Sequence, residues 1–515
     1  MELNRPEGKD CGMRLLCVVL TTLCVLSTGS LLVRAQHYEP TWESLDSRPI
    51  PAWYPEAKFG IFIHWGVYSV PAWRPLSERR YASYAEWYYA SVIDDTLHGG
   101  DAFHRRMYGD DFEYRDFGPM FTAELFDPDE WASLFARSGA RYVVLTSKHH
   151  DGYCLWPTQS PYKREWNSAA VGPHRDLVGD LTAAVRRAGL RMGLYYSLIE
   201  WESSWTHRQP SGYYLNAETV AKYRIPEEDF VTGHILPQLR ELVTTYHPAV
   251  IFSDAGEWDG TEEYWQTKEF LAWLYNEAPN RHEVVVNDRW AAGMPGRHGD
   301  YFSSEYQDTD AIGLAHPWEE SRGMGGSYGF NRAEGIDDYR TSQELIRELV
   351  DVVSRGGNLL LNVGPTADGR IPVIQQQRLL DIGAWLAVNG EAIYGTRAWS
   401  GAGEQKEQGE PRQEQEMEQE LPGGSGRPEG TGEVFFTRKG DDLYVIVFGW
   451  PREAVAVRGV PAGERFTVEM LGVEAPVAYR RDSGVLRLTP PEISPADVPC
   501  EHAFVFRLTG VLPGG

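Results

Sequence analysis

The sequence predicts an α/β protein: a (β/α)8-like barrel of the TIM type, distorted or incomplete, followed by a C-terminal antiparallel β-sandwich. Three observations predict this architecture. Short, very apolar runs alternate with segments of helical period, as in a buried parallel sheet covered by helices. Most of these runs end in polar and aromatic residues, and the carboxyl ends of barrel strands build active sites. Beyond residue 431, apolar and polar positions alternate between Gly and Asp turns, which is typical of antiparallel strands.

The first segment, residues 1–35, is predicted to be a signal peptide. Residues 15–33 are almost free of charge, Arg14 precedes them, and Val33-Arg34-Ala35 matches a cleavage site with small residues. The apolar stretch is close to the length that spans a bilayer, so a retained signal anchor is the alternative. We expect cleavage, no stable membrane insertion afterwards, and a location in the secretory pathway, either lysosomal or secreted.

Composition excludes some classes of function. The chain has 515 residues and a formal charge of −25, which disfavours a nucleic-acid partner because phosphate binding needs a basic surface. After the predicted leader only Cys154 and Cys500 remain. Two cysteines make neither a disulfide framework nor a zinc site, so core packing must supply the stability.

The predicted catalytic domain covers residues 36–400 and shows the alternation of strands and helices in order. Strand candidates occur at 59–66, 142–152, 191–201, 249–258, 283–290, 299–307 and 356–365. Amphipathic helices are predicted at about 128–138, 177–188, 229–246, 262–277, 341–354 and 372–388. Seven strand candidates are one fewer than a full barrel needs. A doubly wound sheet is disfavoured because no Gly-rich phosphate turn follows the first strand.

Residues 401–431 are a low-complexity segment rich in Glu, Gln, Gly and Pro. Such a segment buries too little apolar surface to offset its ordering entropy, so we predict a disordered insert. It separates the catalytic domain from the predicted β-sandwich, residues 432–515.

Two carboxylates at strand ends are candidates for the chemistry. Asp254 lies just past the apolar run 249–252, after Ser253, where position alone allows a nucleophile, a metal ligand or a helix cap. Glu305 follows another short run. Two carboxylates from different strands suit the cleavage of a glycosidic bond, one as general acid and one as nucleophile or base. The pair alone is a weak signal, because other carboxylates also lie near strand ends: Glu86, Asp151, Glu200, Glu257, Asp259, Asp288 and Glu319.

His149, His150 and Asp151 could indicate a metal ion. Adjacent side chains on a strand point in opposite directions, however, and no third ligand at metal spacing accompanies them. Hydrogen bonds to a polyhydroxylated substrate explain paired imidazoles equally well. We therefore expect no metal ion and no cofactor.

Specific motifs identify a resemblance over about residues 38–510. AKFGIFIHWGVYSVPAW, YVVLTSKHHDGYCLWPT, GLYYSLIEW, VVVNDRW, GGNLLLNVGPTADG and NGEAIYGTR resemble the retaining α-L-fucosidases of glycoside hydrolase family 29, closest to the animal tissue type. The resemblance implies an imperfect catalytic barrel, a C-terminal β-sandwich, and hydrolysis of terminal α-L-fucose from glycoconjugates with net retention. It also implies a homo-oligomer, because relatives often form dimers or tetramers.

The resemblance assigns roles position by position. Asp254 matches the nucleophile and Glu305 the acid/base of the tissue-type subgroup. Residues that match those holding the fucose ring in relatives are His64, Glu86, Trp87, His149, His150, Tyr195, Phe252 and Arg289.

Two departures from the family pattern keep alternatives open. Relatives commonly carry Trp at the position of Phe252, and Ala255 is an extra residue after the nucleophile. A fucose-binding, lectin-like protein without catalysis is one alternative. A barrel glycosidase for a different sugar such as galactose is another.

Overall fold

The computed structural model of the chain describes residues 36–77, 82–93, 99–201, 203, 222–306, 316–399, 433–461 and 466–511. The predicted signal peptide (1–35) and the predicted insert (401–431) lie outside the described residues. Residues 1–39 and 40–515 are two separate units, and all described helices and strands belong to the second.

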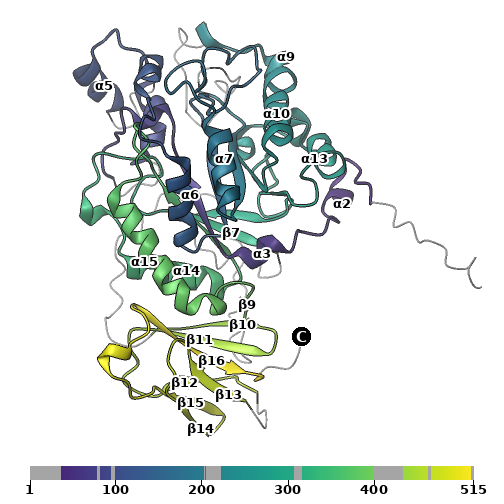
Figure 1. Cartoon of the computed structure of the whole chain (residues 1–515). Coiled ribbons are helices and arrows are strands. Elements are labelled where there is room, and N and C mark those ends of the chain that lie inside the picture. The colour runs from purple at the N-terminus through teal and green to yellow at the C-terminus, as the bar shows by residue number, and fades with distance from the viewer. Residues whose placement is uncertain are drawn as a thin grey trace, which may run out of the picture. The chain divides into compact units, whose positions relative to one another are not determined.

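Eight parallel strands form one curled sheet, which confirms the predicted barrel class (Figure 1). They follow the order β5-β4-β3-β2-β1-β8-β7-β6, and each neighbouring pair is parallel. The strands are β1 (Phe59–Ile63), β2 (Tyr142–Lys148), β3 (Arg191–Ser197), β4 (Val250–Asp254), β5 (Val285–Val286), β6 (Phe302–Glu305), β7 (Trp318–Gly323) and β8 (Asn358–Val363).

The structure corrects the strand count from seven to eight. The additional strand is β7, whose sequence WEESRG is polar although most of it is buried. The other strands are shorter than the apolar runs that predicted them, because the last residues of several runs belong to the loops at the strand ends. His149 and His150, for example, follow β2 rather than ending it.

A buried ion pair bridges the edges of the sheet, β5 and β6. Asp300, just before β6, donates its N–H to the carbonyl of Val286 at 3.0 Å and accepts the Val286 N–H on Oδ2 at 2.9 Å. Arg48 Nη1 donates to both Asp300 oxygens at 2.9 and 3.0 Å, and Nη2 donates to the Val284 carbonyl at 2.7 Å. The Arg48–Asp300 pair thus connects the two edge strands, β5 and β6, which are not neighbours in the hydrogen-bonded sheet.

Replacing Arg48 by Met should destabilise the fold strongly. The change leaves the Asp300 carboxylate buried without its cation, a situation that typically costs about 3–5 kcal/mol. Chemical denaturation of wild type and variant measures the loss. The control is Arg187→Met, which breaks an exposed pair with Asp129 and should cost at most about 1 kcal/mol. Equal losses for the two variants would contradict a role for the buried pair.

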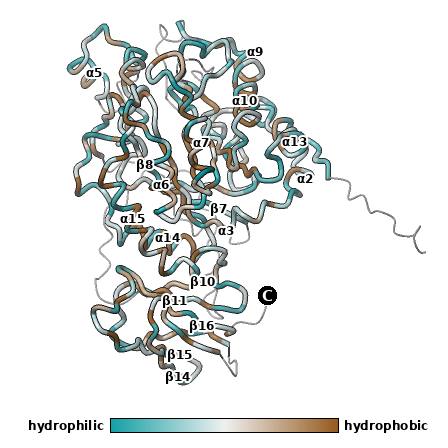
Figure 2. The backbone as a smooth tube through the Cα atoms, in the orientation of Figure 1, coloured by the Kyte–Doolittle hydropathy of each residue, from teal (hydrophilic) through white to brown (hydrophobic). Residues whose placement is uncertain are grey.

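Amphipathic helices cover the sheet, and hydrophobic and hydrophilic stretches alternate along them (Figures 1 and 2). Five match the predicted positions: α6 (Pro128–Arg137), α7 (Leu177–Arg187), α10 (Leu236–Tyr246), α14 (Ser342–Ser354) and α15 (Val373–Asn389). The predicted helix 229–246 begins with the π-helical turn η5 (Phe230–Ile235). The predicted helix 262–277 is instead two, α12 (Glu262–Trp265) and α13 (Thr267–Asn276), because Gln266 adopts φ +52°.

Local sequence signals set the ends of several helices. Asp127 caps α6 ahead of Pro128, and Thr341 with Glu344 forms a capping box on α14. The remaining short elements are α2 (Trp42–Leu45), α3 (Trp53–Ala57), α4 (Tyr88–Ile93), α5 (Gly100–Tyr108), α9 (Glu227–Asp229), α11 (Gly256–Asp259), η1 (Val67–Ser69), η2 (Ala85–Trp87), η3 (Tyr114–Met120), η7 (Ile336–Asp338), η8 (Gly390–Ala392) and η9 (Pro495–Asp497).

The C-terminal part forms two antiparallel sheets, as predicted. One contains β13 (Thr467–Met470), β16 (Ala503–Thr509), β11 (Asp442–Phe448), β10 (Val434–Lys439) and β9 (Arg397–Ala398); the other contains β12 (Val455–Val457), β15 (Val485–Thr489) and β14 (Ala478–Asp482). Val445, Val457, Leu486 and Phe506 lie in the apolar core that these strands share. Trp385 Nε1 on α15 donates to the Ala503 carbonyl at 2.9 Å, which joins the sheets to the barrel helices. Within the described residues, no helix combines the length and the apolar character needed to cross a bilayer.

Candidate active site

A pocket of about 260 Å³ opens at the carboxyl ends of the barrel strands. This volume is slightly below the roughly 300–1,000 Å³ of drug-sized ligand sites, so the pocket suits a single ring. The structure brings all ten predicted site residues together here: His64, Glu86, Trp87, His149, His150, Tyr195, Phe252, Asp254, Arg289 and Glu305.

Arg289 bridges the two candidate catalytic carboxylates. Its Nη1 lies 3.3 Å from Asp254 Oδ1 and 3.2 Å from Glu305 Oε2, so these two oxygens are separated by at most about 6.5 Å, the sum of the two distances. Arg289 Nε donates to Ser303 Oγ at 2.9 Å, which orients the guanidinium. The two carboxylates therefore face one site, as covalent glycosidase chemistry requires.

The surroundings of Asp254 favour its charged form. Burial alone would raise the pKa of Asp254, but the charge of Arg289 and the hydrogen bond from Tyr195 OH, at 2.6 Å, outweigh it and hold this pKa below the usual value. Asp254 is thus an ionised carboxylate at the end of β4, the form that a nucleophile needs. Glu305, at the end of β6, accepts a hydrogen bond from Tyr84 OH at 3.0 Å.

Hydrogen-bond partners assign the tautomer of His150. Ser197 Oγ donates to the Ile199 carbonyl at 2.7 Å, so its single proton is used there. Ser197 Oγ must therefore accept from His150 Nδ1, which is 2.7 Å away. Burial lowers the pKa of His150 to about 4, so the ring is neutral near pH 5–7 and Nε2 carries a lone pair. This Nε2 lies 3.6 Å from Asp254 Oδ2 and can accept a hydrogen bond from a substrate hydroxyl.

His64 is held in the same tautomer by a different partner. Asn362 Nδ2 donates to the Tyr328 carbonyl at 2.6 Å, which fixes the amide so that its Oδ1 faces His64 Nδ1 at 2.7 Å. His64 Nδ1 therefore carries the proton and Nε2 is an acceptor. Burial lowers the pKa of His64 to about 4. In both His64 and His150, Nδ1 donates to a protein oxygen and Nε2 is left as a hydrogen-bond acceptor.

Aromatic and acidic residues complete the pocket wall. Phe252 stacks with Tyr195 at 5.8 Å between ring centres, and the Arg289 guanidinium lies 5.7 Å above the Phe252 ring. Glu86 Oε2 accepts the N–H of Gly329 at 2.8 Å. The phenyl ring of Phe252 therefore supplies an apolar wall without a hydrogen-bond donor.

Most other candidate carboxylates have different surroundings. Asp151 accepts from Tyr114 OH at 2.6 Å, and Asp288 accepts the Ser303 N–H at 2.9 Å. Glu319 lies near the start of β7, where Tyr54 OH donates to it at 3.0 Å. Glu257 and Glu86 differ from these three in that they line the pocket. Within the described residues, no group of three His, Cys, Asp or Glu side chains is arranged to hold a metal ion.

Sequence reasoning missed several lining residues: Tyr84, Ser303, Ser321 and Tyr328. Ser321 lies on β7, the strand that was not predicted, and Tyr328 lies in the Gly-rich loop after it. No local sequence signal marks these four residues as lining residues.

Comparisons with known proteins agree with this geometry. The family model described as alpha-L-fucosidase matches residues 25–391, and the model of the alpha-L-fucosidase C-terminal domain matches residues 427–509. The chain belongs to the α-L-fucosidase family. It is 40% identical to tissue alpha-L-fucosidase of Homo sapiens over 514 residues, which is 99% of this chain and 98% of the relative. It is also 40% identical to plasma alpha-L-fucosidase of Rattus norvegicus, over 97% of this chain and 100% of that one.

Solved α-L-fucosidase structures have the same fold. The Thermotoga maritima α-fucosidase in complex with fucose is 36% identical and superposes with a TM-score of 0.73, covering 92% of this chain and 100% of that chain. The complex of that enzyme with a mechanism-based inhibitor gives 37% identity and a TM-score of 0.74 over the same shares.

Ala255 makes a sharp turn after Asp254. Ala255 is buried and adopts φ +64°, a left-handed conformation that disfavours a side chain. Beyond it, Gly256 packs so closely that an added Cβ would lie 2.3 Å from the Trp290 carbonyl oxygen. The turn nevertheless leaves Glu257 and Trp258 in the pocket wall.

Proposed function

We propose that this chain is a retaining exo-α-L-fucosidase that removes terminal α-L-fucose from glycoconjugates by double displacement. The observation that carries the proposal is the Arg289 bridge, in which one guanidinium nitrogen contacts the carboxylates of both Asp254 and Glu305. Retaining glycosidases place their carboxylates about 5–5.5 Å apart and inverting ones about 6.5–9.5 Å. The upper bound set by Arg289 favours retention.

Each residue then has a defined part. Asp254 attacks the anomeric carbon and forms an ester with it, while the bond to the leaving oxygen breaks and Glu305 gives that oxygen its proton. A water molecule next attacks the same carbon, Glu305 takes its proton, and the ester bond to Asp254 breaks. Nε2 of His64 and of His150 accept hydrogen bonds from fucose hydroxyls. Two inversions at one carbon release α-L-fucose.

The direct test is hydrolysis of an aryl α-L-fucoside followed by NMR of the first product. We expect α-L-fucose before mutarotation. Release of the β anomer first would exclude double displacement. Tight binding of fucose without turnover would favour the lectin-like alternative. Faster turnover of the matching aryl α-L-galactoside would favour a different sugar, since L-galactose differs from L-fucose only in carrying a hydroxymethyl group in place of the methyl group.

Glu86 should control the alkaline side of the pH profile. Burial raises the pKa of Glu86 to about 7, although the hydrogen bond from the Gly329 N–H acts in the opposite direction and lowers this pKa. The carboxyl is neutral at acidic pH, and above pH 7 it adds negative charge to a pocket that already holds Asp254 and Glu305. We expect kcat/KM to fall as pH rises through 7 and Glu86→Gln to keep its activity to higher pH. Profiles of both proteins over about pH 4–9 check this; superimposable alkaline limbs would contradict it.

The same proposal covers location and organisation. Residues 1–35 act as a cleaved signal peptide, and the mature protein is lysosomal or secreted, which the leader sequence and the resemblance to tissue and plasma fucosidases support. Residues 36–400 form the catalytic domain, 401–431 an insert and 432–515 the sandwich. The partner is a fucosylated glycan, and the protein assembles with copies of itself.

A further inference from the structure

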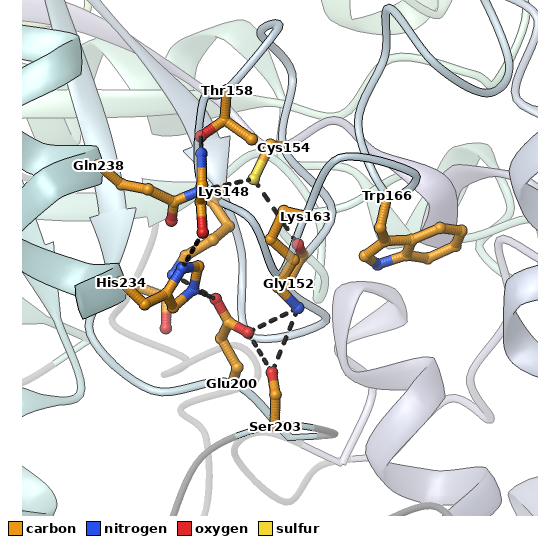
Figure 3. A network of polar contacts seen from close by, with 12 residues as sticks. Lys148, Gly152, Cys154, Thr158, Lys163, Trp166, Glu200, Ser203, His234 and Gln238 are labelled. Atoms are coloured by element: carbon orange, nitrogen blue, oxygen red, sulfur yellow. Dashed lines mark hydrogen bonds and ion pairs between the residues drawn. The ribbon is translucent and has the colours of Figure 1, made fainter. Parts of the chain in front are cut away.

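A second cluster of charged side chains lies behind the pocket and takes no part in the mechanism. At its centre is Glu200, which is completely buried. Lys148 Nζ lies 2.7 Å from Glu200 Oε1 and Lys163 Nζ lies 2.7 Å from Oε2. His234 Nε2 contacts Oε1 at 2.7 Å, and the Ser203 hydroxyl donates to Oε2. Figure 3 shows these side chains converging on the one carboxylate.

The charges in this cluster hold one another in place. Burial would raise the pKa of Glu200, but Lys148 and Lys163 outweigh it and keep this pKa well below the usual value. Burial lowers the pKa of His234 to about 4, so His234 is a neutral donor to Glu200. Removing one member of a buried ion pair leaves the others without compensation. The cluster is therefore a rigid clamp between the segments that supply it.

Those segments carry the pocket residues. Lys148 is the last residue of β2 and directly precedes His149 and His150, while Glu200 follows β3 and directly precedes Trp201. The Trp201 N–H donates to the His150 carbonyl at 2.7 Å. The Lys148–Glu200 ion pair thus ties the end of β2 to the end of β3.

Trp201 supports three residues of the pocket wall. The centre of its ring lies 5.2 Å from that of His150, 6.0 Å from that of His149 and 5.8 Å from that of Trp87. Ser197, the last residue of β3, carries the hydroxyl that fixes the tautomer of His150. Movement of Glu200 would therefore disturb both the packing and the protonation of His150.

The loop after His150 fits closely over the cluster. Gly152 adopts φ +71°, and a Cβ added there would lie 2.7 Å from Lys163 Nζ and 3.1 Å from Glu200 Oε2. No side chain fits between this loop and the clamp. The loop that carries the two imidazoles rests directly on the buried charges.

We propose that Glu200 is a positioning residue for the reaction, which acts by holding His150 and Trp201 in the geometry that binds the sugar. This inference rests on the proposed function. It assigns a role in substrate binding to a charged cluster that lies outside the pocket.

A double-mutant cycle tests whether Glu200 acts through His150. The kcat/KM on an aryl α-L-fucoside, per folded site, is measured for wild type, Glu200→Gln, His150→Ala and the double variant. We expect Glu200→Gln to lower kcat/KM about tenfold or more in the wild-type background. In the His150→Ala background the same change should lower kcat/KM by no more than about threefold. Losses that multiply in full would overturn the proposal.

Arg48→Met is the matched control, because it breaks a buried ion pair near the start of β6, away from the pocket. It should lower the unfolding temperature and leave kcat/KM within about twofold. If Glu200→Gln lowers only the unfolding temperature as well, the cluster is structural and the proposal fails.

Two further measurements keep the outcomes separate. Should Glu200→Gln not fold, Lys163→Met is the substitute variant, because it leaves Lys148 as the one lysine paired with the Glu200 carboxylate. It should lower kcat/KM about threefold, and it should have no effect in the His150→Ala background. An unchanged kcat/KM would overturn the proposal. Calorimetry with a fucose-configured iminocyclitol measures binding directly. Absence of wild-type turnover would defeat the proposed function, whereas iminocyclitol binding equal in wild type and the Glu200 variant would defeat the positioning role.

Discussion

Replacing Asp254 by Gly should abolish most of the activity, with a loss of about 10⁴-fold or more in kcat on an aryl α-L-fucoside. The change removes the carboxylate that Tyr195 and Arg289 keep ionised, so no ester can form at the anomeric carbon. Steady-state kinetics measure the loss, and circular dichroism with the unfolding temperature checks that the variant folds.

Azide distinguishes loss of a nucleophile from a general loss of structure. In Asp254→Gly, azide can occupy the space of the carboxylate and attack from the face opposite the leaving group. A single inversion of an α-fucoside gives β-L-fucosyl azide. Recovery of this anomer is the expected result, and residual activity close to wild type without azide would remove Asp254 from the mechanism.

Replacing Glu305 by Ala should cost about 10²- to 10⁴-fold in kcat/KM on substrates with a poor leaving group, because the departing oxygen then lacks its proton donor. Aryl fucosides with an acidic phenol need little protonation and should lose much less in the first step. A series of aryl fucosides with phenols of different acidity measures this dependence. A loss that is the same for all leaving groups would contradict an acid role.

The product of azide rescue again assigns the role. In Glu305→Ala the ester with Asp254 still forms from an activated fucoside, and azide can replace water in the second displacement. Two inversions then give α-L-fucosyl azide, the opposite anomer from that of the Asp254 variant. Glu257→Gln is the control, because Glu257, like Glu86, is a further carboxyl that lines the pocket. If the Glu257 variant alone yields the α azide, the acid/base is Glu257 and not Glu305.

The strands that carry the site could be predicted, and one strand could not. Continuous apolar residues identify a strand that is buried on both faces. In β7 the buried positions are instead occupied by Glu319 and Glu320. Their partners outside the strand are Tyr54 for Glu319 and the Tyr306 N–H for Glu320, and Arg322 of the same strand pairs with Glu320. A polar strand stabilised by such contacts carries no local signal, which is why the barrel seemed one strand short.

The site itself was more predictable than the helix boundaries. The carboxyl ends of parallel strands meet at one edge of a sheet, so residues such as His64, Asp254 and Arg289 had to converge once the strands were recognised. By contrast, the apolar residues of 262–277 keep a helical spacing across Gln266, although the helix breaks there into α12 and α13. The cause of this break is a left-handed backbone turn at a non-glycine residue, which sequence pattern does not reveal.

In the proposed mechanism, the fixed tautomers of His64 and His150 limit which fucose units the pocket can accept. Each imidazole offers a lone pair, so the sugar must bring a hydrogen to both places. A methyl ether at either oxygen has none to give and also adds bulk. Glycans that end in O-methylated fucose should therefore resist hydrolysis by this enzyme. Methylation of the terminal sugar alone would be enough to slow the degradation of the whole glycoconjugate.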